Sequence, residues 1–507
     1  MKRRYVALII LCIIITANTP YFFGIFHRET GLLFSGFINN PIDGNSYLAK
    51  MQEGFLGSWK FYLPYSYEAT PSSYLFLFYI FLGHVSRWVG VPLILIFHFA
   101  RLLSSVFLFS SLWYLSELIF TDPKDSVKAF LLASFGSGMG WILLPWSIIS
   151  ADFWVTEAYP FLSSVTNPHF PLGLACMVWL LILYMAPNVW CRLLKLFVLS
   201  SALAIIMPFG VVIIVLIIVM DVLLRRILKE KVPYITAACI ALPGGILISA
   251  QYIQTMSDPF LRLWNIQNQT PSPALWDLLI SLSPALLVAI WAILKKPKQF
   301  GNQLLSLLTS WLVITLFLMY LPLNIQRRFM LGMYIPIAFL CVFGLTSISV
   351  SVRKRNIAWI IVILISALTN IATMFGNTVN VTKENPLLFV TLDEKKTYDW
   401  ISKNIPKDGI FLASPETGNN IPAYTGRRVV YGHPFETIDA DKRKSESISF
   451  FSEGLTKSQV NDYINKRQVD YVFWGPREKK LGNQPDLSEL SVIFKNETIS
   501  VLTTKNE

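Results

Sequence analysis

The sequence predicts an α-helical polytopic membrane protein with about eleven transmembrane helices, followed by an extracytoplasmic α/β domain at the C-terminus. Two observations indicate the membrane part. Hydrophobic residues make up 54% of the 507 positions, and the mean hydropathy is +0.51, which is too apolar for a soluble protein. Several apolar runs also contain about 20 residues, enough to cross a hydrocarbon core of roughly 30 Å. We therefore expect a multi-pass protein of the plasma membrane.

The first apolar run, Tyr5 to Phe26, follows the basic residues Lys2, Arg3 and Arg4. A signal peptide has a similar basic start, but this run lacks a clear small-x-small cleavage site and many further apolar runs follow it. We expect it to be retained as the first helix, with the N-terminus in the cytoplasm.

Charge decides how many of the twelve apolar runs cross the membrane. If the run 72–90 crossed, the basic loops that follow it would lie opposite the basic N-terminus. If it stays outside, all of these loops share the cytoplasmic side, as the positive-inside rule favours. We therefore predict that 72–90 lies on the outer face as a juxtamembrane helix and that the C-terminus is outside. The runs are 5–26, 72–90, 91–119, 126–149, 171–187, 195–207, 209–224, 233–254, 275–294, 303–321, 328–349 and 356–375.

The span count depends on the runs 195–207 and 209–224. Both are short, and only Pro208 and Gly210 separate them. Merging the two runs into one span would invert the orientation of everything downstream.

The net charge of +12 does not indicate a nucleic-acid partner. From residue 376 onward there are 18 Lys and Arg against 18 Asp and Glu, so the excess, 25 against 13, lies in the membrane part. There it gathers in short loops and sets topology. No cysteine follows residue 376, and the five histidines show no ligand spacing, so we predict no disulfide framework and no histidine metal site.

The chain is predicted to divide into a membrane domain, 1–375, with an outer loop 27–90, and an α/β domain, 376–507. In the second part, charged amphipathic segments alternate with short β-branched or aromatic runs, as in a small α/β domain. It contains no glycine-rich phosphate loop. The predicted helices are 393–404 and 456–467, and the predicted strands are 409–413, 428–431, 469–474, 490–494 and 499–503.

The stretch from Asn39 to Pro64 is predicted to be a long outer loop that carries the chemistry. It is rich in Gly, Asn and aromatic residues, and Asp43 stands at its head between Pro41 and Gly44. An outward carboxylate can take a proton from an acceptor hydroxyl or hold a metal. The alternative, that Asp43 stabilises a local turn, has about equal weight.

Other charged residues are predicted on the same outer face. Glu157 and Asp152 precede His169; they form an acid pair over a cavity, or they are solvated acids beside a histidine that holds a proline turn. Arg327 and Arg328 end a helix on the outer side, where they bind phosphate through planar guanidinium groups or extend to lipid headgroups.

Three further charged residues have two readings each. Arg101 lies inside an apolar run and is either functional or paired within the bundle. Lys50 and Glu53 lie one helical turn apart, and they either contact substrate or pair with each other.

Taken together, this arrangement resembles the GT-C glycosyltransferases, which include protein O-mannosyltransferases, the lipid A aminoarabinose transferase and oligosaccharyltransferases. The shared pattern is an early Asp in the first outer loop, juxtamembrane helices, a second outer acid and an exported C-terminal domain. The segment PIDGNSYLAKMQEGFLGSW is similar to the first loop of bacterial members. Segments similar to uncharacterised prokaryotic relatives are RLLSSVFLFSSLWYLSELIF, FWVTEAYPFLSSVTNPHF, QRRFMLGMYIPIAFL and YDWISKNIPKDGIFLASPETGNNIPAYTGRRVVYGHPFET.

The resemblance implies transfer of a sugar from a polyprenyl-phosphate donor to a glycolipid, cell-wall glycan or protein acceptor in the cell envelope. Asp43 would be the catalytic base, Glu157 the second acid, and Arg327 and Arg328 the contacts to the donor phosphate. The first loop has a single acid where an Asp-x-Asp or Asp-Glu pair would hold a metal, so no cofactor is assigned and a divalent ion (Mg or Mn) stays open. The sequon-binding motif of oligosaccharyltransferases is absent.

Two other classes of protein compete with this interpretation. A transporter or lipid flippase would place unpaired acids at the middle of its spans, whereas the acids here lie mostly in outer loops. A non-catalytic scaffold would tolerate alanine at Asp43 and Glu157.

Overall fold

The computed structural model describes residues 3–26, 31–68, 72–187, 190–295 and 303–504. Lys2, the start of the predicted outer loop with His27, and the lysines at 296 and 298 lie outside the described residues. The chain forms two compact units. We call the first the helical unit; it comprises Met1–Phe22, His98–Ala250 and Gln269–Val379. We call the second the sheet unit; it comprises Phe23–Phe97, Gln251–Asn268 and Asn380–Glu507.

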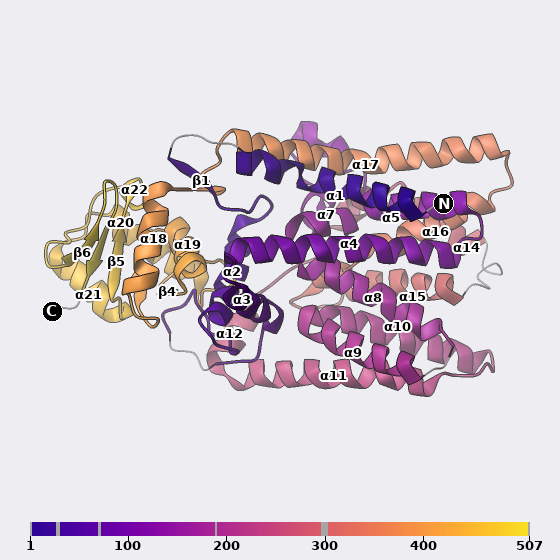
Figure 1. Ribbon diagram of the computed structural model, residues 1–507, viewed down its shortest axis with the longest axis horizontal. Helices are drawn as coiled ribbons and strands as arrows, with labels where there is room; N and C mark the ends of the chain where they lie inside the picture. Colours follow the sequence, from indigo (N-terminus) through magenta and orange to yellow (C-terminus); the bar gives the residue numbers. More distant parts are fainter. Residues whose placement is uncertain (1–2, 27–30, 69–71, 188–189, 296–302, 505–507) are drawn as a thin grey trace. The chain divides into compact units, whose positions relative to one another are not determined.

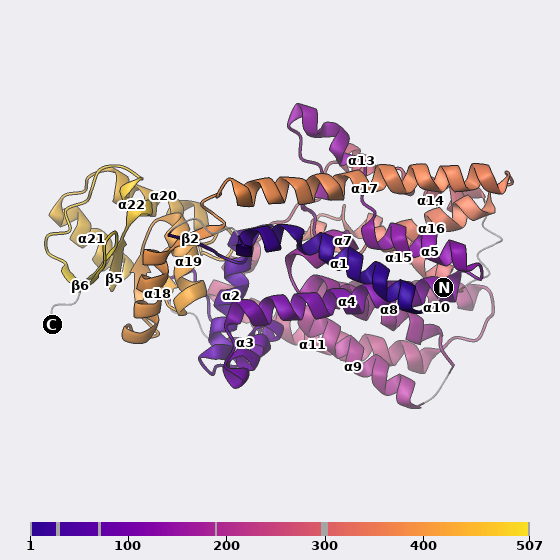
Figure 2. The same cartoon turned by 45° about the horizontal axis from the view of Figure 1, so that its top comes forward.

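The helical unit consists of helices, several of them long enough to span a membrane (Figures 1 and 2). Seven helices of the described chain have the length and apolar composition of a span, and α13 with α14, bent by 91°, makes up to eight. The chain is therefore a multi-pass membrane protein, while the count of about eleven spans and the orientation of the termini stay predictions. The bounds are α1 (Arg3–Phe26), α4 (Leu93–Ile119), α5 (Pro123–Phe135), η1 (Gly140–Trp146), α6 (Ala151–Trp154), α7 (Pro160–Thr166), α8 (His169–Met185), α9 (Trp190–Ile206), α10 (Pro208–Ile227), α11 (Tyr234–Ser257), α13 (Leu275–Leu282), α14 (Ala285–Lys295), α15 (Gln303–Leu318), η3 (Gln326–Met330), α16 (Tyr334–Ser347) and α17 (Val352–Thr382).

The two short apolar runs around Pro208 form separate helices that pack on each other, α9 and α10. Met207 has extended φ and ψ angles of −154° and 78°, and Pro208 begins the new helix at its first position. Proline suits that position because its missing N–H would have no partner there anyway. The two runs are therefore separate helices, and their number of membrane spans stays a prediction.

The sheet unit contains a tight crossing of two helices, α2 (Pro41–Phe55) and α3 (Leu77–Val89). A Cβ atom on Gly54 would overlap the Ile80 carbonyl oxygen, and one on Gly83 would overlap the Met51 carbonyl oxygen. Glycine is therefore required where the two backbones meet. The helix α3 falls inside the predicted run 72–90, and its 13 residues extend about 20 Å. Its location at a membrane surface stays a prediction.

Within the described part of this unit, seven strands form two sheets. β1 (Leu32–Phe34) and β2 (Phe389–Thr391) are an antiparallel pair with Leu33 opposite Val390. The larger sheet has the order β4-β3-β5-β7-β6, in which β4, β3 and β5 are parallel and β7 and β6 are antiparallel to their neighbours. The bounds are β3 (Ile410–Leu412), β4 (Arg428–Val429), β5 (Tyr471–Trp474), β6 (Ser491–Lys495) and β7 (Ser500–Thr503).

Helices cover both faces of the larger sheet. Successive residues of a strand point to opposite sides, so neighbouring residues of one strand enter different cores. Phe411 packs in one core, which includes α18 and α19, and Ile410 packs in the other, which includes α20 and α21. Figure 1 shows α18 and α19 beside the sheet. Ala49 of α2 and Tyr65 belong to the first core. The helices are α12 (Pro259–Gln267), α18 (Leu392–Asn404), α19 (Pro415–Thr425), α20 (Ala440–Ser452), α21 (Lys457–Arg467) and α22 (Pro476–Lys479).

The predicted α/β character of the C-terminal part is confirmed. Both predicted helices and all five predicted strands are present, whereas α19 and α20 were not predicted. The predicted division at residue 376 falls within α17, which continues to Thr382, and the unit that holds the larger sheet also holds 23–97 and 251–268. The predicted domain division and the placement outside the cytoplasm stay predictions.

The crossing of α2 and α3 makes a first prediction. Gly83→Ala should lower the free energy of unfolding by about 1–3 kcal/mol, because the added methyl group forces the two backbones apart. Thermal unfolding of the purified protein in detergent measures this change.

The matched control is Gly245→Ala in α11, where nothing lies within 4 Å of an added Cβ. This variant should unfold at or slightly above the wild-type temperature, because alanine favours helix. An equal, small effect of both substitutions would contradict the tight crossing.

Candidate functional site

Asp43 lies in the first turn of helix α2, and the prediction of a loop from Asn39 to Pro64 is wrong for residues 41–55. Asn40 is the N-cap, with φ 52°, and its side-chain oxygen accepts the Asp43 N–H at 3.4 Å. Pro41 occupies the first helical position, where proline is common. The positive end of the helix dipole stabilises an acid in the first turn, which here is Asp43. The side chain that caps the helix is that of Asn40, and the turn-stabilising alternative for Asp43 stays a prediction.

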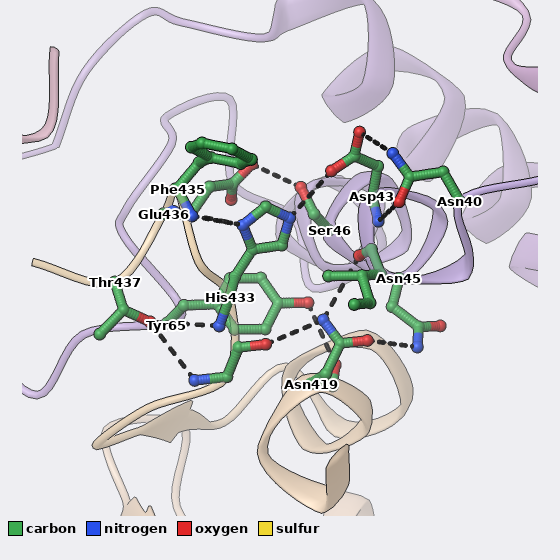
Figure 3. Close-up of polar contacts among 12 residues, drawn as sticks. Asn40, Asp43, Asn45, Ser46, Tyr65, Asn419, His433, Phe435, Glu436 and Thr437 are labelled. Atoms are coloured by element: carbon green, nitrogen blue, oxygen red, sulfur yellow. Dashed lines mark hydrogen bonds and ion pairs between the residues drawn. The ribbon is translucent and has the colours of Figure 1, made fainter. Parts of the chain in front are cut away.

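Two side chains hold the Asp43 carboxylate (Figure 3). Asn40 donates from Nδ2 to Oδ2 at 2.5 Å, and His433 Nε2 lies 3.1 Å from Oδ1. The His433 side chain is 2% exposed, whereas that of Asp43 is 35% exposed. Asp43 therefore has a fixed orientation and is still reachable from outside the protein.

Lys50 and Glu436 form a buried ion pair next to Asp43. Lys50 Nζ lies 2.6 Å from Glu436 Oε1, with side-chain exposures of 0% and 11%. Ser46 Oγ donates to the same carboxylate oxygen at 2.5 Å and accepts from Lys50 at 2.5 Å. The Phe76 ring lies 4.4 Å from the ammonium group, so that cation–π attraction adds to the pair.

The predicted pairing of Lys50 with Glu53 is wrong. Glu53 Oε2 instead accepts from Lys407 Nζ at 2.9 Å. Burial raises the pKa of Glu53, and Lys407 offsets part of that effect. At Glu436 burial also favours the neutral acid, but the charge of Lys50 and the hydrogen bonds from Lys50 and Ser46 outweigh it and lower the pKa. Glu436 is therefore ionised at neutral pH.

Amide side chains extend the contact between α2 and α19. Asn45 Nδ2 donates to Asn419 Oδ1 and to Asn420 Oδ1, both at 2.8 Å. Asn419 Nδ2 donates in turn to the carbonyl oxygens of Ile42, at 3.3 Å, and Gly432, at 3.0 Å. This network connects the first turn of α2 to the segment that carries His433.

Glu157 lies with the arginine pair in the helical unit. Its Oε1 is 3.4 Å from Arg327 Nε and 3.8 Å from Arg328 Nη1, and its side chain is 4% exposed. The Arg327 guanidinium also lies 5.1 Å from the Trp154 ring. Backbone hydrogen bonds from Gly332 and Tyr334 to residues 157 and 158 hold the acid in place. The Glu157 carboxylate thus faces the guanidinium groups of both arginines.

Arg101 and Asp152 are both buried, and Asp152 is therefore not the solvated acid of the second alternative. Arg101 is 2% exposed; it donates to Asn18 Oδ1 at 2.6 Å and to the Ser164 carbonyl oxygen at 2.8 Å, so it is paired inside the bundle. Asp152 accepts from Ser150 Oγ at 2.6 Å and from the Gly140 N–H at 3.1 Å, and it thereby holds its own loop together.

His169 begins α8 and is buried against the Phe170 ring, with 4.0 Å between the ring centroids. The substrate-binding roles predicted for Lys50, Glu53, Arg101 and His169 stay predictions.

The sequence-based reasoning missed His433 and Glu436. Their signal is a Gly-His-Pro-Phe-Glu-Thr segment directly after an apolar strand, where polar residues interrupt a buried run. Sequence spacing alone could not pair them with Asp43 and Lys50, since His433 and Asp43 are 390 residues apart.

Three solved structures resemble the chain in fold. ArnT from Cupriavidus metallidurans bound to undecaprenyl phosphate has a TM-score of 0.52 and 10% identity, and the match covers 99% of this chain and 98% of that one. The Archaeoglobus fulgidus oligosaccharyltransferase AglB, in complex with an inhibitory peptide and a dolichol-phosphate, has a TM-score of 0.54 and 11% identity over 93% and 69%. The mycobacterial arabinofuranosyltransferase AftD has a TM-score of 0.53 and 10% identity, and the match covers 100% of this chain and 40% of that one.

All three are GT-C membrane glycosyltransferases, so the chain has the GT-C fold, as the sequence predicted. No protein-family model matches the sequence. No curated protein matches it either.

The buried ion pair makes the second prediction. Lys50→Met should destabilise the protein by about 3–5 kcal/mol, because it leaves Glu436 charged and buried without its cation. Adding Glu436→Gln to Lys50→Met should recover most of the loss, since the neutral amide no longer needs a counter-charge. Thermal or denaturant unfolding of the two single variants and the double variant measures the coupling.

Lys457→Met is the control, because the Lys457–Glu489 pair has side-chain exposures of 52% and 42%. An exposed pair contributes little, so the unfolding temperature should hardly change. Additive effects of the two substitutions at Lys50 and Glu436 would contradict the coupling.

Proposed function

We propose that this protein is a membrane glycosyltransferase that moves a sugar from a polyprenyl-phosphate donor to an extracytoplasmic acceptor. The observation that carries the proposal is the GT-C fold, matched over 99% of the chain to a protein bound to undecaprenyl phosphate. Because a fold hosts many activities, the residues must also suit the reaction. A glycolipid, a cell-wall glycan or a protein provides the acceptor hydroxyl.

Asp43 is the general base in this proposal. The acceptor oxygen attacks the anomeric carbon, its proton passes to the Asp43 carboxylate, and the bond between that carbon and the phosphate oxygen breaks. The polyprenyl phosphate leaves with the bonding electrons, so that the sugar inverts its configuration. The partial exposure of Asp43 suits this role, and its two hydrogen bonds hold the carboxylate in one orientation, which proton transfer requires.

Arg327 and Arg328 bind the phosphate of the donor in this proposal. Their distances to Glu157, 3.4 and 3.8 Å, exceed the 2.7–2.9 Å or so of a close charge-assisted bond. Glu157 therefore orients the guanidinium groups without forming a close charge-assisted bond to either of them. Side-chain exposures of 24% and 28% leave each guanidinium accessible. The sequence-based role of Glu157 as a second catalytic acid is replaced here by this orienting role.

The proposed mechanism contains no metal step. Among the described residues, no three His, Cys, Asp or Glu side chains form a group that suits a metal ion. At Asp43, both carboxylate oxygens already accept hydrogen bonds from protein side chains.

The third prediction concerns Asp43. Asp43→Asn should lower kcat/KM about 100- to 10,000-fold, the range that a general base contributes. The assay supplies purified protein in liposomes with labelled polyprenyl-phosphate mannose, glucose or galactose, and with envelope material of the source cells as acceptor. The exposed Asp462→Asn is the control and should transfer at the wild-type rate. Full transfer by a folded Asp43→Asn variant would contradict the catalytic role.

The fourth prediction concerns the arginine pair. Arg327→Gln and Arg328→Gln should each raise KM for the donor about tenfold, the effect of one lost charge-assisted hydrogen bond. The value of kcat should change less, because the phosphate is bound before and during the reaction. Initial rates against donor concentration provide both constants.

Arg262→Gln, an exposed substitution on α12, serves as the control for overall charge and should leave KM unchanged. If Arg262→Gln raised KM as much as the two test variants, donor binding would depend on net charge, and the pair would have no specific role.

A further inference from the structure

His433 sits in a short, internally bonded segment between β4 and α20, the residues 432–437. The N–H groups of Gly432 and His433 donate to Thr437 Oγ1 at 3.3 and 3.2 Å, and the Thr437 N–H donates to the His433 carbonyl oxygen at 3.1 Å. Gln267 of α12 donates to the Thr437 carbonyl oxygen at 2.5 Å and accepts the Asp439 N–H at 3.2 Å. The segment is therefore held at both ends.

The backbone of this segment determines which nitrogen of His433 carries the proton. The N–H groups of Phe435 and Glu436 both point to Nδ1, at 3.1 and 3.2 Å. A nitrogen that accepts two hydrogen bonds cannot carry a hydrogen of its own in the ring plane, so the proton of the neutral ring is on Nε2. Nε2 faces Asp43 Oδ1 at 3.1 Å, and the histidine is consequently a donor to the carboxylate.

We propose that His433 is a positioning residue for Asp43, an inference that rests on the proposed function. The segment 432–437 fixes the ring, and the ring fixes one oxygen of the carboxylate, while Asn40 holds the other. Asp43 is 35% exposed, and loss of the ring would remove the contact that orients Oδ1. A base that is already held in one orientation loses less conformational entropy on reaching the transition state.

If His433 had a purely structural role, that role would depend on Nδ1, the ring nitrogen that faces away from Asp43. In that case His433 would matter because Nδ1 accepts the two backbone N–H groups, and its contact with Asp43 would be incidental. Two substitutions separate these roles. Glutamine places an N–H donor near the position of Nε2 but has no atom at Nδ1, whereas asparagine places an acceptor near Nδ1 and does not reach Asp43.

The fifth prediction compares His433→Gln with His433→Asn in the liposome assay, using the labelled donor that the wild type turns over. We expect His433→Asn to lower kcat at least tenfold with KM for the donor unchanged, because His433 does not bind the donor. We expect His433→Gln to recover most of that kcat. The reverse order, with His433→Asn near wild type and His433→Gln impaired, would overturn the positioning role.

A measurement without turnover keeps the inference testable if either variant unfolds. In ¹⁵N-histidine-labelled wild-type protein, the NMR signals of His433 should show a protonated Nε2 and an unprotonated Nδ1. The resonance should move in Asp43→Asn, which removes the charge that Nε2 faces. A ring protonated on Nδ1, or a signal unaffected by Asp43→Asn, would contradict the proposal.

Failure of this inference is distinguishable from failure of the proposed function. If Asp43→Asn is inactive while His433→Asn keeps the wild-type kcat, the result supports Asp43 as the general base and contradicts the positioning role of His433. If Asp43→Asn transfers sugar fully, the catalytic assignment falls, and the positioning role falls with it.

Discussion

The buried pair of Lys50 and Glu436 is the constraint on which the rest of the candidate site depends. Two charges removed from water need close contact with each other, and Lys50 Nζ and Glu436 Oε1 lie 2.6 Å apart. Asp43, Ser46 and Lys50 are spaced three and four residues apart, so they lie on one face of α2. On the opposite segment, His433 precedes Glu436 by three residues. The contact that joins Lys50 to Glu436 thereby also sets His433 against Asp43.

The same rule explains the buried charges of the helical unit. Arg101 donates to carbonyl and amide oxygens, Asp152 accepts from N–H and hydroxyl groups, and Glu157 faces two arginines. Arg101 and Asp152 use their polar contacts to hold the structure. Glu157 is different, since it faces two guanidinium groups whose side chains are 24% and 28% exposed, and such groups suit an anionic ligand.

Similarity to the three solved structures concerns the fold of the chain, whereas the candidate site depends on individual residues. At 10% or 11% identity, apolar residues can exchange for one another throughout the bundle and the fold persists. A site does not tolerate such exchange, because it depends on particular atoms at particular distances. Here those atoms come from segments nearly 400 residues apart, which the fold of the sheet unit brings within hydrogen-bond distance.

The sequence by itself determined the class of the protein, the α/β character of its C-terminal part and the charged residues of interest, because hydropathy and strand alternation are local properties. Ile410, Phe411 and Leu412 show this, as they alternate between the two cores. Helix α2 escaped prediction because Gly44 and Gly54 lower helix propensity, and its packing against α3 and α19 adds to the local cap at Asn40 to stabilise it. Tertiary structure alone decided that Lys50 pairs with Glu436 and not with Glu53. Glu53 is buried as well but faces Lys407, so the packing of α2 against the rest of the sheet unit, and not spacing along the helix, decides the partner of each charge.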